Sequence, residues 1–194
     1  MKIGIVSENF QHDSQALKAL LRKKYQDKNV EFLPILKKVS GDKIFGKRVA
    51  ALIEQQAKEK KLDLVLLAKD LDALPSDESK IIILKEKANN IRNQITLDLS
   101  FFLIIFELEA LILADIDTFK KIYKIPTYQY KKNPKFQSNP KEELKKATRK
   151  SNRKYKESDT PEIFQQLNFN KVYQNHNGEY SFQSFINELE STIK

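Results

Sequence analysis

The sequence predicts an α/β fold with a mainly parallel sheet of about four strands flanked by helices, followed by a basic, mainly helical C-terminal part. Short apolar runs alternate with helical patterns from the N-terminus onward. The 194 residues, 40% of them hydrophobic, are enough to bury one core. We therefore expect an α/β core over residues 1–117 and an extension over residues 118–194, packed on the same domain.

Four short apolar runs predict strands, at residues 2–6, 30–36, 62–68 and 100–106. Runs of this kind are typical of strands that are buried on both faces of a parallel sheet. Pro34 lies in the second run and indicates an edge position or a bend, because proline cannot donate to a strand ladder.

Helices are predicted wherever apolar residues recur at helical spacing. The first begins at Ser14, a second runs from Val49 towards residue 61, and two more span residues 77–91 and 108–117. The last is a terminal helix with its apolar residues at Phe182, Phe185, Ile186, Leu189 and Ile193. Residues 123–139 hold two prolines and no clear period, which predicts a loop.

Composition excludes several kinds of site. The chain has no cysteine, so disulfides, thiolate zinc sites and thiol catalysis are excluded. Its two histidines, His12 and His176, are far apart in sequence, so any metal is expected to be held by oxygen ligands. The apolar run at the N-terminus is too short for a signal peptide, and no stretch approaches the roughly 18 apolar residues of a spanning helix. We expect a cytoplasmic protein without membrane contact.

The net charge of +9 is concentrated in one segment. Between Thr118 and Lys156 there are 14 Lys or Arg residues and only two acids, Glu142 and Glu143, so the rest of the chain is slightly acidic. An acidic first half followed by a basic segment suits a protein that holds cations in one place and polyanions beside it.

Acidic residues follow three of the predicted strands. Glu8 follows the first, Asp70 and Asp72 follow the third, and Glu107 and Glu109 follow the fourth. The carboxyl ends of parallel strands meet at one edge of a sheet, and residues two apart in an extended chain point the same way, so we expect these carboxylates to converge. Clustered carboxylates repel one another unless a cation lies between them, and Mg²⁺ or Mn²⁺ prefers such oxygen ligands. Each acid taken alone is better explained as a turn or cap residue, and it is their combination that favours a site.

The basic run at residues 144–156 is a second candidate site. If this run is helical, one face presents four cations to a nucleic-acid backbone: Lys145, Arg149, Arg153 and Lys156. Tyr155 is then available to stack on a base. A solvated helix face or a flexible loop explains the same run equally well.

The arrangement of acids resembles the Toprim domain, a Rossmann-like domain shared by topoisomerases, bacterial primases and the overcoming-lysogenization-defect (OLD) nucleases. The segments FELEALILAD (residues 106–115), NPKEELKK (139–146) and YSFQSFINEL (180–189) are similar to a bacterial stand-alone Toprim-like family of unknown function. The resemblance covers nearly the whole chain. Its ELEA and terminal SFxxF pieces are more distinctive than its DxD piece.

The resemblance implies a function and roles for individual residues. Glu8 corresponds to the acid-base or metal-binding glutamate, Asp70 and Asp72 to metal ligands, and Glu107 and Glu109 to the ELE positions. It implies a Mg²⁺- or Mn²⁺-dependent nuclease, with DNA as the expected nucleic acid, in bacterial phage defence and sometimes beside an ATPase partner. The chain is too short to hold a topoisomerase gate and lacks the cysteines of a primase zinc module.

The sequence departs from the Toprim pattern after Glu8. Toprim domains usually have glycine at the next position and an acid about four residues on, whereas this chain has Asn9, and Asp13 lies five residues on. Asparagine readily adopts a left-handed turn, so we expect the loop to be retained. The position of Asp13 is left open.

Two further functions remain compatible with the sequence. One is a non-catalytic nucleic-acid-binding or regulatory subunit that works through a protein partner. The other is phosphoryl transfer or hydrolysis on a small molecule such as a nucleotide, with an incidental basic segment. The replacement of glycine by Asn9 favours the subunit, and the five acids at strand ends favour the nuclease.

Overall fold

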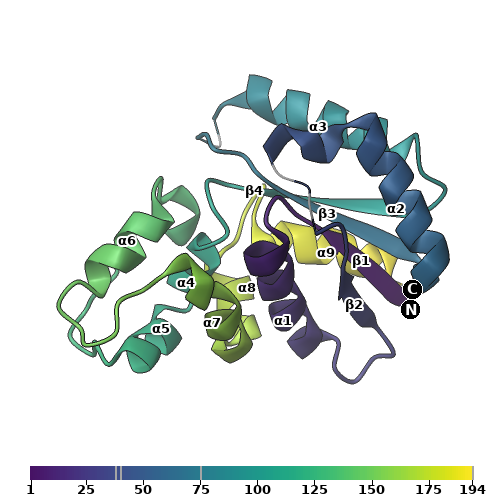
Figure 1. Ribbon diagram of the computed structural model, residues 1–194. Coiled ribbons are helices and arrows are strands. Elements are labelled where there is room, and N and C mark those ends of the chain that lie inside the picture. Colours follow the sequence, from purple (N-terminus) through teal and green to yellow (C-terminus); the bar gives the residue numbers. More distant parts are fainter. Residues whose placement is uncertain (38, 40, 75, 194) are drawn as a thin grey trace.

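The computed structural model describes residues 1–37, 39, 41–74 and 76–193 and confirms the α/β class (Figure 1). Four parallel strands form one sheet in the order β2-β1-β3-β4. The strands are β1 (Lys2–Val6), β2 (Glu31–Pro34), β3 (Leu64–Asp70) and β4 (Asp98–Ile104). β2 is an edge strand, as Pro34 predicted, and it ends at this proline, two residues before the end of the predicted run.

The fourth strand ends two residues earlier than predicted. β4 ends at Ile104, which pairs with Asp70 of β3, so these two strands stop at the same level. The chain then turns at Phe106, which has a φ of 61°. The prediction that the strand extends to residue 106 was therefore wrong. Ile105 and Phe106 are apolar because they are buried in the turn after the strand, not because they belong to it.

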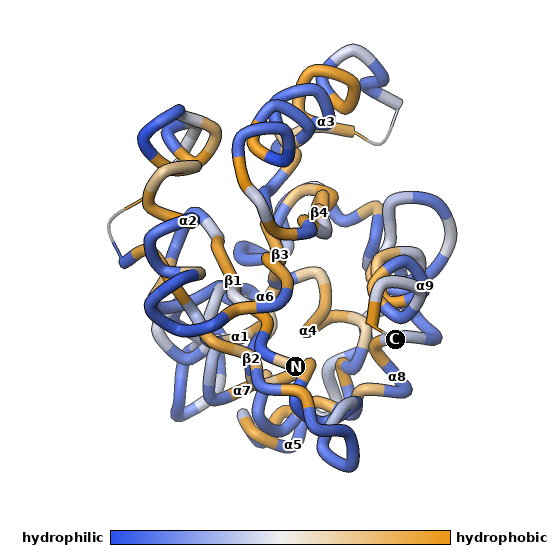
Figure 2. Tube along the Cα trace, turned by 90° about the vertical axis from the view of Figure 1, so that its right-hand side faces the viewer, coloured by the Kyte–Doolittle hydropathy of each residue, from blue (hydrophilic) through white to orange (hydrophobic). Residues whose placement is uncertain are grey.

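Two helical layers cover the two faces of the sheet. Helices α2 (Lys47–Lys60) and α3 (Glu78–Arg92) lie on one face, and α1 (Gln15–Lys24) and α9 (Phe182–Thr192) on the other (Figure 1). Alternate residues of β3 supply the two cores: Leu64 and Leu66 face α1, and Val65 and Leu67 face α2. Figure 2 shows that apolar residues concentrate in the strands and in α4 (Ala110–Ala114).

Further short helices lie beyond the carboxyl ends of the strands (Figure 1). They are α4, α5 (Ile116–Tyr123), α6 (Pro140–Ala147), α7 (Thr160–Gln166) and α8 (Phe169–Asn175), with single turns η1 (Phe10–Ser14), η2 (Gly41–Phe45), η3 (Pro134–Phe136) and η4 (Glu157–Asp159). The helix expected over residues 108–117 is two helices that meet at Asp115. The expected boundary at residues 117/118 falls within α5, and one apolar core contains residues from both sides of it.

The terminal helix α9 is confirmed, and its apolar face covers β4. Phe185 stacks on Phe102 of β4 with ring centroids 4.3 Å apart. His176, which is buried, supports the helix start, because its Nδ1 accepts the Phe182 N–H at 2.9 Å. Burial and the positive charge of Lys135 lower the pKa of His176 to about 4, so this histidine is a neutral structural residue.

In the part of the chain that the structure describes, no helix combines the length and the apolar character needed to cross a membrane.

Candidate carboxylate site at the ends of the strands

The strand order places Glu8 and Asp70 on either side of a topological switch point. From β1 the chain crosses to β2 on one side, and from β2 it returns to β3 on the other side of β1. In open parallel sheets, ligands bind at the carboxyl ends of the two strands where the direction of winding reverses. Glu8 follows the end of β1 by two residues, and Asp70 is the last residue of β3.

Asp70 is coupled electrostatically to four other acids. Burial raises the pKa of Asp70 well above its ordinary value, and the negative charges of Asp13, Glu109, Glu8 and Asp72 raise it further. Among the described residues, no hydrogen bond reaches the Asp70 carboxylate, and the positive charge of Lys141 offsets only part of this repulsion. The environment of the Asp70 carboxylate is therefore strongly acidic.

Asp13 joins the cluster through one turn of π-helix. The Ser14 N–H bonds the Asn9 carbonyl, five residues earlier, at 3.2 Å, and this wide turn absorbs the extra residue between Glu8 and Asp13. Asn9 caps the turn with a φ of −124°, so the expected left-handed turn is not formed. Burial and the charge of Glu8 raise the pKa of Asp13 to about 6, although Lys141 opposes this shift.

Asp72 does not share the environment of Asp70. Its φ of 50° interrupts the extended chain, so the prediction that both carboxylates point the same way from a strand was wrong. The Asp72 side chain is 61% exposed. Because its charge still raises the pKa of Asp70, Asp72 lies near the cluster, at its solvent side.

Lys69, which sequence reasoning missed, lies among these acids. Its side chain is only 7% exposed and forms an ion pair with Glu8. The same ammonium lies 3.8 Å from the Asp72 carboxylate and donates to the Asp70 carbonyl at 3.1 Å. A lysine inside a strand of apolar residues was the available signal, because a buried lysine needs an anionic partner.

Glu107 and Glu109 connect the site to the start of α6. The Lys141 N–H donates to Glu107 at 3.1 Å, and the Lys141 ammonium lies 3.4 Å from Glu107 and 4.0 Å from Glu109. Glu109 is buried and accepts the Tyr155 hydroxyl at 3.1 Å. Burial raises the pKa of Glu109 to about 7, and the charges of Asp13 and Glu107 add to the shift, while Lys141 opposes it. Sequence reasoning missed Lys141 as well.

The chemistry of the donor atoms at this site suits a divalent cation, but in the described residues the donor side chains do not converge on one point. All the donors are carboxylate oxygens, which Mg²⁺ and Mn²⁺ prefer. Within residues 1–37, 39, 41–74 and 76–193, no three His, Asp or Glu side chains approach closely enough to hold a metal ion. Lys69 lies where Glu8 and Asp72 would meet a cation.

The basic run does not form the predicted helical face. Helix α6 ends at Ala147, before three of the four predicted cations. Lys145 pairs with Glu142 at 2.8 Å, and Arg153 pairs with Glu162 at 2.7 Å. The other two predicted cations, Arg149 and Lys156, are exposed, and the Lys156 N–H donates to Asp159.

Tyr155 is not available to stack on a base. Only 3% of its surface is exposed, and its ring packs edge-on against Phe119 and Tyr123. Its hydroxyl interacts with Glu109 and with Thr160. Tyr155 therefore belongs to the core behind the carboxylates.

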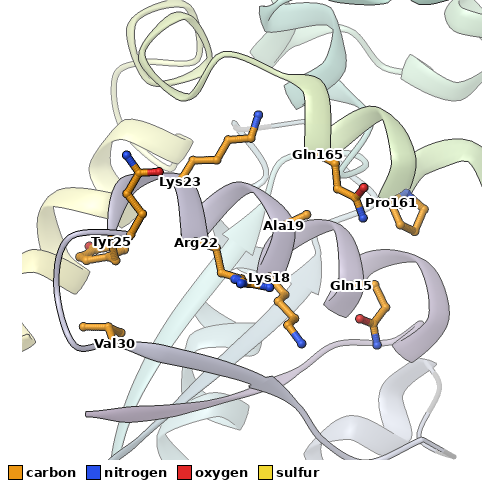
Figure 3. Close-up of a pocket in the computed structure, with 10 residues that line it drawn as sticks. Gln15, Lys18, Ala19, Arg22, Lys23, Tyr25, Val30, Pro161 and Gln165 are labelled. Atoms are coloured by element: carbon orange, nitrogen blue, oxygen red, sulfur yellow. The ribbon is translucent and has the colours of Figure 1, made fainter.

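A larger hollow of about 850 Å³ lies between α1 and α7, and none of the site acids lines it. Figure 3 shows Lys18 and Arg22 extending from the same helix, with Gln165 of α7 above them. Lys23, at the upper edge, is engaged by the Leu167 carbonyl at 2.6 Å. This hollow has a cationic rim and is separate from the carboxylate site.

Comparison with known protein families gives a match over most of the chain. No curated protein and no solved structure matches the chain. A family model described as a domain of unknown function (DUF4276) matches residues 11–190, which include Asp13, Asp70, Asp72, Glu107 and Glu109, whereas Glu8 precedes the matched segment. Because this match spans most of its length, the chain belongs to the DUF4276 family.

Proposed function

We propose that the protein is a divalent-metal-dependent phosphodiesterase that cleaves nucleic acid, with DNA as its expected substrate. The observation that carries the proposal is the grouping of Glu8, Asp13 and Asp70 at the β1/β3 switch point, where burial and mutual repulsion raise the pKa values of Asp70 and Asp13. The resemblance of the sequence to Toprim nucleases supports the same function.

Asp70, Glu8 and Asp72 are the residues proposed to hold the metal. When bound, a Mg²⁺ or Mn²⁺ ion would polarise the phosphodiester and make bound water more acidic. Glu8, which is 24% exposed, is placed to accept a proton from water. Glu109, with its pKa raised to about 7, can hold a proton near neutral pH, and the Lys141 ammonium beside it can stabilise negative charge.

Cleavage assays with matched variants test the proposal. Supercoiled plasmid and single-stranded DNA are incubated with Mg²⁺, Mn²⁺ or EDTA. The wild-type protein is expected to cleave only with metal, and Asp70→Asn to lose at least 100-fold in rate. Asp77→Asn is the control, because Asp77 only caps α3 and asparagine caps equally well. Equal activity of wild type and Asp70→Asn would contradict the proposal.

A second candidate function is a non-catalytic, nucleic-acid-binding or regulatory subunit. The ion pair between Lys69 and Glu8 favours it, because this lysine partly neutralises the acids without a metal. Salt-sensitive DNA binding without cleavage under any condition would support this function. A cytoplasmic role in phage defence beside an ATPase partner is a proposal that rests on the Toprim resemblance alone.

A further inference from the structure

A basic groove lies between the end of α5 and the end of α6. It encloses about 510 Å³ and combines residues of three segments: the C-cap of α5 with the connection after it, the last turn of α6, and the turn that follows α6. Its lining contains four basic residues, Lys124, Lys146, Arg149 and Lys150. All four are exposed, and no acidic residue lines the groove.

These four cations differ from Lys145 and Arg153, two basic residues of the same segment, in how their side chains are engaged. In the described part of the chain, no ion pair or hydrogen bond engages their side chains. By contrast, Lys145 pairs with Glu142 and Glu157, and Arg153 pairs with Glu162 and Asp159. Lys145 and Arg153 are therefore neutralised internally, whereas the four cations that line the groove remain available to a ligand.

The acid next to the groove, Glu143, is hydrogen-bonded to a residue that lines the groove. The Tyr128 ring lines the groove, and its hydroxyl donates to the Glu143 carboxylate. This bond fixes the orientation of the ring and holds the Glu143 carboxylate against it. The groove consequently presents aromatic and aliphatic surface together with positive charge, a combination that suits a nucleic-acid strand.

Helix α6 connects the groove to the carboxylate site. Its first turn places Lys141 beside Glu107 and Glu109, and its last turn contributes Lys146 to the groove. With a rise of about 1.5 Å per residue, these two lysines are roughly 8 Å apart along the helix axis. That distance corresponds to about two nucleotide steps of a duplex strand, at roughly 3.4 Å per step.

We propose that this groove binds the phosphate backbone of a nucleic acid and directs the strand towards the carboxylate site. Four unpartnered cations would contact successive phosphates, so binding is sensitive to salt and insensitive to sequence. The proposed destination of the strand rests on the proposed function. Binding in the groove itself needs neither metal nor cleavage.

The test is the affinity of the full chain for a fluorescent 20-nucleotide single strand, measured by anisotropy in EDTA between 50 and 200 mM salt. The groove variant is Arg149→Gln/Lys150→Gln, and the matched control is Lys145→Gln/Arg153→Gln, which removes the same charge from the same segment. The groove variant is expected to bind at least tenfold more weakly and to lose about 1.4 from the slope of log K against log salt, at roughly 0.7 per phosphate contact. The control is expected to change affinity less than threefold.

Three results would overturn the groove. They are equal losses in the two variants, an unchanged affinity in the groove variant, or a loss seen only in Lys18→Gln/Arg22→Gln, which removes the cations of the other hollow. Circular dichroism checks that each variant is folded. The two proposals can be distinguished by their results. Groove-dependent binding without metal-dependent cleavage would contradict only the proposed enzyme activity. Metal-dependent cleavage together with binding that does not depend on the groove would contradict only the proposed role of the groove.

Discussion

The Lys69 ammonium forms an ion pair with the Glu8 carboxylate, across the boundary between neighbouring strands β3 and β1. The pair places a positive charge at the position where the strand order predicts a ligand. It offsets part of the repulsion in an acidic cluster that includes Asp70 and Asp13. A cation bound by Glu8 and Asp72 would compete with Lys69 for the same oxygens.

Replacing Lys69 by methionine is expected to destabilise the protein. The change leaves the Glu8 carboxylate without its cation and should lower the free energy of unfolding by about 3 kcal/mol, the usual cost of breaking a buried ion pair. Urea denaturation at pH 7.5 in EDTA measures it. The double variant Lys69→Met/Glu8→Gln should recover more than half of the loss, because the Glu8 charge that lost its partner is also removed. Additive losses in the double variant would show that the pair contributes nothing.

Replacing Glu109 by glutamine is expected to change how stability depends on pH. The pKa of Glu109 is raised from 4.5 to about 7, so the folded protein binds this proton more tightly than the unfolded chain, and stability is lost as pH rises through that window. Relative to Glu109→Gln, wild type should lose about 3 kcal/mol between pH 4 and pH 8, at roughly 1.4 kcal/mol per pKa unit. Glutamine can still accept the Tyr155 hydroxyl.

The measurement is chemical denaturation across this pH range in EDTA, taken as the difference between wild type and variant so that other titrating groups cancel. Glu142→Gln, at an exposed position on α6, is the control. Parallel pH profiles for wild type and Glu109→Gln would show that Glu109 titrates alike in the folded and unfolded chains.

His176 is expected to contribute pH dependence of the opposite sign. Its pKa is lowered from 6.5 to about 4, so the unfolded chain binds this proton first, and stability is lost as pH falls from 6.5 towards 4. His176→Asn keeps an acceptor for the Phe182 N–H and should flatten the profile in this window. Denaturation at pH 4 to 7 measures it, with His12→Asn as the control. A steep profile that persists in His176→Asn would assign the effect to another group.

Tyr155→Phe distinguishes a core residue from a base-stacking one. Losing the hydroxyl removes its bond to Glu109 and should lower the free energy of unfolding by about 1 kcal/mol. The affinity of Tyr155→Phe for single-stranded DNA should stay within twofold of wild type. The affinity of Tyr155→Leu, which removes the ring and is partly destabilised, should also stay within twofold. A tenfold loss of DNA affinity in Tyr155→Leu, at a temperature where this variant is fully folded, would show that Tyr155 contributes to DNA binding.

Much of the fold was predictable because apolar runs and helical spacing report burial directly. The strand at residues 2–6 and the helix from Phe182 follow from this pattern, and so does β3, although it lies at Leu64–Asp70 and not at the predicted residues 62–68. The edge position of β2 follows from Pro34. The end of β4 was not predictable, since Ile105 and Phe106 are buried in a turn as fully as they would be in a strand. The break at Asp115 depends on its tertiary bond from the Asn168 N–H.

The candidate site was predictable in part, for similar reasons. Strand ends placed Glu8 and Asp70 correctly, because parallel topology brings such positions together whatever the loops do. Asp13 reaches the cluster only through a π-helical turn, which the spacing of residues in the sequence does not predict. The basic run was assigned to a helical face by periodicity alone, whereas helix α6 ends at Ala147 and Arg153 pairs with Glu162 of α7, a property of the tertiary structure.

The affinity of the full chain for Mn²⁺, measured by isothermal titration calorimetry at pH 7.5, tests the central claim most directly. The wild-type protein is expected to bind Mn²⁺, Asp70→Asn to bind at least tenfold more weakly, and the capping variant Asp77→Asn to bind like wild type. Because a bound cation competes with Lys69 for Glu8, Lys69→Met should bind at least as tightly as wild type. Absence of Mn²⁺ binding in wild type and Lys69→Met, or equal affinity in Asp70→Asn, would contradict a metal site among these carboxylates.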